Sequence, residues 1–171
     1  MKKCIRPLFY DEVLIMEPPF DIRTGDLEAL PAQVRALLSG QQDPVANAAN
    51  LSSLLFYSLD SVNWVGFYFL RDGQLVVGPF QGKPACVSIP LGRGVCGAAA
   101  ASRRVQRVAD VHAFPGHIAC DAESRSEIVL PLLRDGELLG VLDLDSPLAD
   151  RFSAEDERVL VEIAEIYVRS I

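Results

Sequence analysis

The spacing of apolar residues predicts two helices in the first third of the chain. From about Leu27 to Leu59, apolar side chains recur at intervals of three and four, which is the period of one helix face. The segment from Gly40 to Pro44 interrupts this pattern and divides it in two. Asp43 stands directly before Pro44, as expected of an N-cap followed by proline at the first helical position.

After Asn63 the apolar period changes to two, which predicts strands. Aromatic and β-branched residues are concentrated at 64–70 and 74–80, and the intervening Asp72-Gly73 predicts a hairpin. The same tetrapeptide, Leu-Arg-Asp-Gly, occurs at 70–73 and at 133–136. Further expected elements are a strand at 86–89, a glycine-rich turn at 91–94, a short helix at 95–102, and strands at 126–133 and 137–144.

A final helix closes the pattern. It is expected to start near Ser153, which approximates a capping box with Asp156 three residues later. Helices, then strands, then a closing helix favour an α+β fold with a central antiparallel sheet. We find no apolar run of the roughly 18 residues that could span a bilayer, and no internal repeat.

Alternation along the last two strands predicts a cluster of acids. Asp143 and Asp145 share one face of their strand, while the leucines between and before them take the core. Glu127 lies on the same polar face of the preceding strand. If the apolar faces are to coincide, a two-residue loop is excluded and a three-residue loop at 134–136 is required. This register places Glu127 directly opposite Asp143.

Carboxylates that face each other across a strand pair repel, so some other interaction must explain why these acids lie together. One interpretation is that a cation sits among the acids. Another is that one carboxyl keeps a proton at neutral pH because its neighbours raise its pKa. The alternative without function is that the acids are spread over a solvated sheet face. Trp64 and Tyr68, four apart on one strand, are candidates for an aromatic wall beside the acids, although core packing explains them equally well.

A cysteine in the loop before these strands is the second candidate for chemistry. Cys120 follows Pro115 and Gly116 in a turn-rich segment that also holds His112 and His117. It is either a reactive thiol or a buried inert one. A metal site that combines this thiol and the histidines with Asp110 or Asp121 is disfavoured, because the spacing matches no standard ligand pattern.

Composition narrows the class of protein. The chain has 171 residues, half of them hydrophobic, which suits one domain with a sizeable core. A net charge of -7 argues against nucleic acid and anionic membranes, because such partners need clustered Lys and Arg. Residues 1–25 show no sustained period and are interpreted as an arm outside a single domain at 26–171. Charged residues interrupt any signal peptide, so a cytoplasmic location is expected.

The cysteine count fits a reducing compartment. Cys4, Cys86, Cys96 and Cys120 contain no Cys-x-x-Cys pair, and any disulfide among them is expected to be transient. Asp121 and Glu123 should raise the pKa of the Cys120 thiol, so His117, Arg125 or a helix terminus must offset them if this thiol is to ionise near neutral pH.

Several motifs together make the chain resemble the free methionine-(R)-sulfoxide reductases, a family built on the GAF domain. These motifs are Asn-Trp-Val-Gly-Phe-Tyr at 63–68, Gly-Pro-Phe-Gln-Gly-Lys-Pro-Ala-Cys at 78–86, Gly-Arg-Gly-Val-Cys-Gly at 92–97, Asp-Val-His-Ala-Phe-Pro-Gly-His-Ile-Ala-Cys-Asp at 110–121, Ser-Glu-Ile-Val at 126–129 and Gly-Val-Leu-Asp-Leu-Asp-Ser at 140–146. The resemblance runs from about Leu27 to the C-terminus and implies a GAF-like fold, with helices packed on one face of the sheet.

The resemblance also implies roles for matching residues. Cys120 corresponds to the catalytic nucleophile, Cys86 to the principal resolving cysteine and Cys96 to an auxiliary thiol, whereas Cys4 has no counterpart. Glu127, Asp143 and Asp145 correspond to acids that hold the substrate and assist protonation, and Trp64 and Tyr68 to the wall of the pocket.

The implied reaction reduces free L-methionine (R)-sulfoxide, with no metal or organic cofactor. The nucleophile becomes a sulfenic acid, the resolving cysteine forms a disulfide with it, and thioredoxin restores the dithiol, in a context of oxidative stress. A homodimer is compatible with the sequence, which leaves the oligomeric state open. The alternatives are a GAF domain that only binds and senses a small molecule, and a thiol redox switch without turnover.

Overall fold

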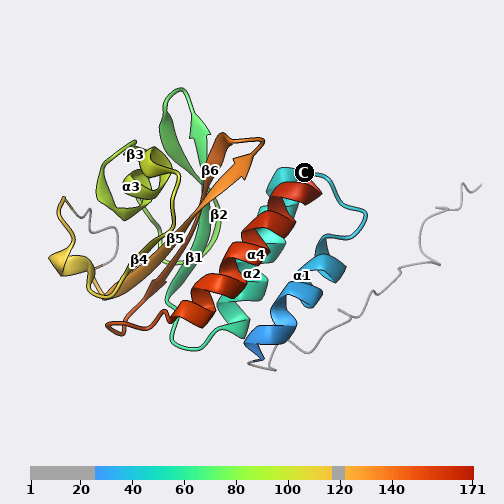
Figure 1. Cartoon of the computed structure of the whole chain (residues 1–171), viewed down its shortest axis with the longest axis horizontal. Coiled ribbons are helices and arrows are strands. Elements are labelled where there is room, and N and C mark those ends of the chain that lie inside the picture. The colour runs from blue at the N-terminus through green and yellow to red at the C-terminus, as the bar shows by residue number, and fades with distance from the viewer. Residues whose placement is uncertain (1–25, 117–121) are drawn as a thin grey trace, which may run out of the picture.

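A computed structural model describes residues 26–116 and 122–171, which form one six-stranded sheet with helices on both faces (Figure 1). The sheet order is β3-β2-β1-β6-β5-β4, and all neighbouring strands are antiparallel. In chain order the elements are η1 (Leu27–Ala29), α1 (Leu30–Leu38), α2 (Pro44–Ser58), β1 (Trp64–Arg71), β2 (Gln74–Gly82), β3 (Ser88–Pro90), α3 (Gly94–Ser102), β4 (Gln106–Val108), η2 (Val111–Ala113), β5 (Ser126–Arg134), β6 (Glu137–Ser146) and α4 (Ala154–Ser170).

The predicted helix starts are confirmed. The Oδ1 atom of Asp43 accepts hydrogen bonds from the backbone N–H groups of Val45 and Ala46, at 2.9 and 2.8 Å. At the start of α4, Ser153 and Asp156 form a capping box in which each side chain accepts from the other's backbone N–H. These caps satisfy amide groups that the first turn of a helix leaves without partners.

The sheet separates two cores. Helices α2 and α4 cover one face, where they bury the leucines of β5 and β6 as the alternation predicted, and α1 packs on these two helices (Figure 1). In this core the rings of Phe67 and Tyr167 lie 4.6 Å apart. The short helix α3 lies on the opposite face and packs on Val129 and Val141 in a second, smaller core. The prediction of helices on one face therefore holds for α1, α2 and α4, which lie on the same side of the sheet, whereas α3 covers the other side.

The predicted register of β5 and β6 is wrong by two residues. Glu127 pairs with Asp145, and Val129 pairs with Asp143. The hairpin uses a two-residue turn, Asp135-Gly136, in which both residues have positive φ, at 50° and 81°, as a type I′ turn requires.

A β-bulge reconciles this tight turn with the buried leucines. Leu133 pairs with Leu138 but Leu132 pairs with Gly140, so β6 contains one extra residue at this point. With a two-residue turn alone, the leucines of β5 and β6 would lie on opposite faces of the sheet. The extra residue in the bulge returns them to the same face. A Cβ atom at Gly140 would lie 2.1 Å from the carbonyl oxygen of Tyr68, so only glycine fits there. The prediction excluded the two-residue loop because it assumed an uninterrupted ladder.

Two short edge strands differ from the expectation. β3 spans Ser88–Pro90 rather than 86–89, so Cys86 lies before the strand. β4 was not predicted, because three residues at a sheet edge are too few to show a period.

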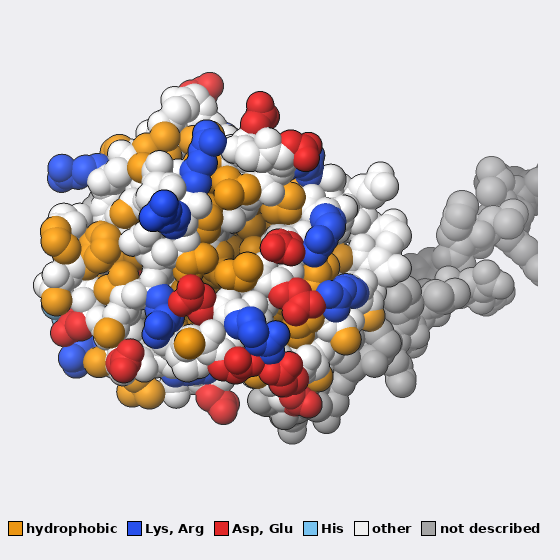
Figure 2. Space-filling model, in the orientation of Figure 1, with side chains coloured by type: hydrophobic (Ala, Val, Ile, Leu, Met, Phe, Trp, Pro, Cys, Tyr) orange, Lys and Arg blue, Asp and Glu red, His pale blue; other side chains and the backbone are white. Residues whose placement is uncertain are grey.

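One face of the molecule carries acidic and basic side chains intermixed (Figure 2). Three ion pairs between exposed or half-buried residues are Arg35–Glu162, Arg107–Glu157 and Arg158–Glu155. In the described part of the chain, no helix is both long and apolar enough to cross a membrane.

Candidate functional site

Two predicted acids lie on the sheet face beneath α3. Glu127 on β5 and Asp143 on β6 are diagonal neighbours across the strand pair. Glu127 faces Asp145, and Asp143 lies two residues before Asp145 on the same face of β6. Their exposed fractions are 6% and 5%. The interpretation of a solvated sheet face is therefore wrong for this pair. The register error shifted the pairing but kept both carboxyls on the predicted face, because a shift of two residues preserves the alternation.

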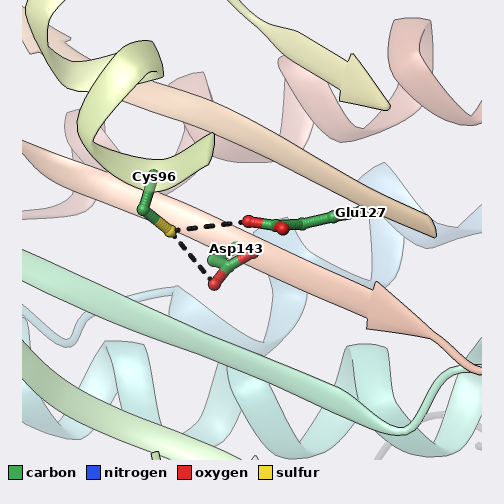
Figure 3. Close-up of side chains that lie close together, drawn as sticks. All are labelled: Cys96, Glu127 and Asp143. Carbon is green, nitrogen blue, oxygen red and sulfur yellow. Dashed lines mark hydrogen bonds between the residues drawn. The ribbon is translucent and has the colours of Figure 1, made fainter. Parts of the chain in front are cut away.

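The Cys96 thiol lies between the two carboxyls (Figure 3). Its Sγ atom is 3.1 Å from Oδ2 of Asp143 and 3.8 Å from Oε1 of Glu127, and the thiol can donate to either. Cys96 is the third residue of α3, whose first turn points its buried side toward β5 and β6. Three elements thus bring one thiol and two acids together in a buried cluster, which we call the Cys96–Glu127–Asp143 cluster.

Burial makes the neutral forms of these groups favourable. It raises the pKa of Glu127 well above the ordinary range, and the charges of Asp143 and Asp145 raise it further. Burial also raises the pKa of Asp143 to about 7, although hydrogen bonds from Cys96 and Glu127 oppose this shift. The pKa of the Cys96 thiol is raised by burial and by both acids. The prediction that a carboxyl keeps its proton near neutral pH agrees with these directions.

Trp64 and Tyr68 stand beside the acids on β1. Trp64 pairs with Asp145 across β1 and β6. The rings of Trp64 and Tyr68 stack with their centroids 5.9 Å apart. Gly66 lies between the two aromatic residues on the same face. A Cβ atom there would lie 2.5 Å from the Trp64 ring and 2.4 Å from the Cβ of Phe80, so the glycine makes room for the indole. The indole Nε1 donates to the backbone oxygen of Lys83 at 3.1 Å.

One pocket collects most of the predicted site residues. It encloses about 540 Å³, including the part open to solvent. Asp145 lines it in a half-buried position and neighbours Glu127 across the strands. The predicted residues that line this pocket are Trp64, Tyr68, Cys96, Glu127, Asp143 and Asp145.

Sequence reasoning missed other residues of the same pocket. Ser124, Lys83 and Arg93 also line it. Ser124 is buried, and its Oγ accepts a hydrogen bond from Nδ2 of Asn63 at 3.2 Å. Lys83 pairs with Glu123 at 2.5 Å, and both side chains are more than half exposed. The motif that contains Arg93 was recognised, but only its cysteine was assigned a role.

Of the other predicted thiols, the structure describes Cys86, which packs against the smaller core but is not among the residues that line the pocket. Cys86 takes part in a disulfide bond, whereas Cys96 is free and buried. Ala85, the residue before Cys86, lines the pocket. Cys120, His117, Asp121 and Cys4 lie outside the described residues, so their predicted roles stay predictions.

The structure does not test the disfavoured metal site at His112, His117 and Cys120, because His117 and Cys120 lie outside the described residues. Its third, His112, is exposed and follows Asp110, which caps η2 by accepting from the His112 backbone N–H at 3.1 Å. Within residues 26–116 and 122–171, the ligand atoms of the Cys96–Glu127–Asp143 cluster lie within 4.8 Å of one another, close enough to hold a metal ion.

Comparisons with known proteins agree with the motifs. The family model for the GAF domain matches residues 54–171. Free methionine-R-sulfoxide reductase of Escherichia coli is 56% identical over 128 residues, covering 75% of this chain and 78% of the relative. The yeast protein of the same name, from Saccharomyces cerevisiae, is 42% identical over 152 residues, covering 84% of both chains.

A solved structure extends this similarity to three dimensions. The Staphylococcus aureus fRMsr in complex with substrate is 47% identical to the chain and superposes with a TM-score of 0.82. The match covers 88% of this chain and 99% of the bacterial protein. The pocket described above therefore lies in a fold that binds substrate in a close relative.

Proposed function

The chain belongs to the free methionine-R-sulfoxide reductases, a family of oxidoreductases built on the GAF domain, and on that premise we propose that its pocket reduces free L-methionine (R)-sulfoxide. The observation that carries this proposal is the buried pair of acids, Glu127 and Asp143, in a pocket walled by Trp64 and Tyr68. A carboxyl that stays protonated near neutral pH can donate to a sulfoxide oxygen.

In the first step, the Cys120 thiolate attacks the sulfoxide sulfur. A carboxyl of the acid pair gives its proton to the sulfoxide oxygen. This oxygen then passes from the substrate sulfur to Sγ of Cys120, and the sulfur–sulfur bond formed by the attack breaks as methionine leaves. The oxygen stays on Cys120 as a sulfenic acid. Glu127 is the proton donor that the surroundings favour, because burial and two neighbouring acids all raise its pKa.

The position of one end of the Cys120 segment supports this role. The backbone N–H of Val111 donates to the carbonyl of Arg125 at 2.9 Å, which joins the two sides of the loop. Ser124 lines the pocket, and Cys120 precedes it by four positions. Four residues span at most roughly 14 Å when fully extended, and this short span supports the attack proposed for Cys120.

In the second step, the Cys86 thiol attacks the sulfenic sulfur, a disulfide forms and water leaves. The disulfide bond of Cys86 and the position of Ala85 on the pocket wall support this role. Thioredoxin then reduces the disulfide by exchange, and the scheme requires no metal or organic cofactor. Cys96 is an auxiliary thiol in this scheme, and its burial among acids disfavours its thiolate. The homodimer and the cytoplasmic location stay predictions.

The acids also account for a preference for the free amino acid. Asp145 is half-buried on the pocket wall, where its carboxylate can pair with the substrate ammonium. A methionine sulfoxide within a polypeptide has an amide in place of that ammonium, so it cannot form the ion pair with Asp145. Protein-bound methionine sulfoxide is therefore a poor substrate in this account.

The test is an assay with racemic free methionine sulfoxide and dithiothreitol, in which chiral chromatography follows both epimers. The expected result is consumption of the R epimer, with the S epimer and an N-acetylated, peptide-linked analogue unchanged. If the protein binds methionine sulfoxide but leaves it unreduced, the result would favour a sensor instead. Peroxide-induced disulfide formation without methionine would favour a redox switch.

A further inference from the structure

The Cys96–Glu127–Asp143 cluster has the donor set of a metal site. We propose that these three side chains bind a zinc ion on the floor of the pocket, and that the bound ion excludes the substrate. The binding site is argued from the cluster alone, whereas exclusion of substrate rests on the proposed function.

The positions of the donor atoms fit zinc. One ligand atom from each residue lies within 4.8 Å of the other two. In a tetrahedral zinc site, a Zn–S bond of about 2.3 Å and a Zn–O bond of about 2.1 Å separate sulfur from oxygen by roughly 3.6 Å. The observed distances from Cys96 Sγ, 3.1 Å to Asp143 and 3.8 Å to Glu127, lie on either side of that value.

An unpartnered oxygen points to a ligand at this position. Oδ2 of Asp143 accepts from the Cys96 thiol, whereas the other carboxyl oxygen, Oδ1, is buried and has no hydrogen-bond partner among the described residues. Buried carboxylate oxygens are normally paired, because leaving one without a partner costs free energy. Among the described residues, no Lys, Arg or His forms an ion pair with Glu127 or Asp143. A bound cation would supply the missing partner.

The mixed donors select the kind of ion. Thiolate is a soft ligand that zinc accepts, whereas Mg²⁺ and Ca²⁺ prefer sites made of oxygen. On binding, the thiol proton and any carboxyl proton pass to solvent, and no electrons are transferred. Three protein ligands leave the fourth tetrahedral position for a water molecule on the pocket side, since all three residues line the pocket.

The site is independent of the proposed redox pair. Cys96 is a free thiol while Cys86 is disulfide-bonded, so the three ligands are present when the pair is oxidised. Zinc would occupy the carboxyls that hold the proton for the sulfoxide, and would therefore compete with the substrate. The cluster thus provides a reversible inhibitory site for zinc.

The experiment uses full-length protein that carries Cys4→Ser, Cys86→Ser and Cys120→Ser, so that Cys96 is the one remaining thiol. Zinc affinity is measured by competition with a chromophoric chelator, and Co²⁺ serves as a spectroscopic probe. The expected results are one zinc per chain and a sulfur-to-cobalt charge-transfer band. Further replacement of Cys96 by Ser should weaken zinc binding by roughly 100-fold or more, because it removes a direct ligand, and should abolish the band.

Two further variants keep the test decisive. Asp143→Asn should weaken zinc binding while circular dichroism confirms the fold, and Glu123→Gln, which changes an exposed acid beside the pocket, should leave the affinity unchanged. Free methionine sulfoxide should lower the apparent zinc affinity of the Cys96-only protein, which cannot turn over. Absence of a stoichiometric site, or zinc binding unaffected by loss of Cys96, would overturn the zinc site. Zinc binding in a protein without reductase activity would instead overturn only the proposed function.

Discussion

The Sγ atom of Cys96 lies 3.1 Å from Oδ2 of Asp143, and both side chains are at least 95% buried. A neutral thiol in this position donates a hydrogen bond to the carboxylate form of the acid. This interaction lowers the pKa of Asp143 and partly opposes the effect of burial, which raises it. The thiol therefore adjusts the protonation of the acid pair even where it takes no part in bond formation.

Replacing Cys96 by Ala removes this hydrogen bond. We expect the pKa of Asp143 to rise above its value of about 7 in the Cys96→Ala variant. Carbon-13 NMR of labelled aspartate measures it, with Asp143→Asn used to assign the resonance. Cys4→Ala is the matched control and should leave the titration unchanged. A titration of Asp143 that moves to lower pH, or does not move, would show that the thiol does not donate to this carboxylate.

The raised pKa of Asp143 makes stability depend on pH. The value is about 7 in the folded protein and 3.8 in an ordinary aspartate, so the folded state holds a proton that the unfolded chain releases. This contribution is complete at pH values below the unfolded value and is lost as the pH rises through 7. Glu127, whose pKa is also raised, acts in the same direction.

Asp143→Asn isolates that contribution, because an amide does not ionise. Its free energy of unfolding relative to the parent protein should increase from about pH 5 to about pH 8, by a few kcal/mol. Urea denaturation under reducing conditions measures both proteins across this range. Asp60→Asn, at an exposed aspartate outside the acid pair, serves as the control for the chemical change itself. A difference that shrinks as the pH rises would contradict the assignment of a raised pKa.

The wall of the pocket depends on a missing side chain at Gly66. In Gly66→Ala the new Cβ would lie 2.5 Å from the Trp64 ring, so the indole must move. Overpacking of this kind costs about 1–3 kcal/mol of stability. We also expect weaker binding of the sulfoxide, measured by calorimetry in a variant without Cys120. Unchanged substrate affinity, together with unchanged Trp64 fluorescence, would remove the indole from the pocket wall.

The capping box of α4 gives a prediction far from the site. Ser153→Ala removes the oxygen that accepts from the Asp156 backbone N–H at 3.1 Å. The free energy of unfolding should fall by about 1 kcal/mol, the usual effect of losing an N-cap side chain. The control, Ser39→Ala, changes an exposed serine at the C-terminal end of α1. Equal stability of the two variants would show that the cap contributes nothing.

Local patterns predicted most of the fold. Period and capping residues located α1, α2 and α4, because the Asp43 and Ser153 caps depend on neighbours a few positions away. They also predicted which face of β6 carries acids, since alternation is a property of the strand itself. What they could not supply was the register, because the bulge next to Leu133 depends on how two strands pair around a tight turn.

The site was predicted unevenly for the same reason. Trp64, Glu127 and Asp145 were found because motifs and alternation mark them. The closeness of Cys96 to the acids was not, because it depends on α3 crossing the opposite face of the sheet. Ser124 has no sequence signal of its own, and its place in the pocket follows from the chain path before β5.

The most direct test of the central claim is the yield of a single turnover. Pre-reduced Cys86→Ser protein is mixed with free methionine (R)-sulfoxide in the absence of reductant, and the methionine formed is quantified. The account predicts one methionine per chain and a sulfenic acid that a dimedone probe labels at Cys120, whereas Cys120→Ser yields none. An equal yield of methionine from Cys120→Ser, or none from Cys86→Ser, would contradict it.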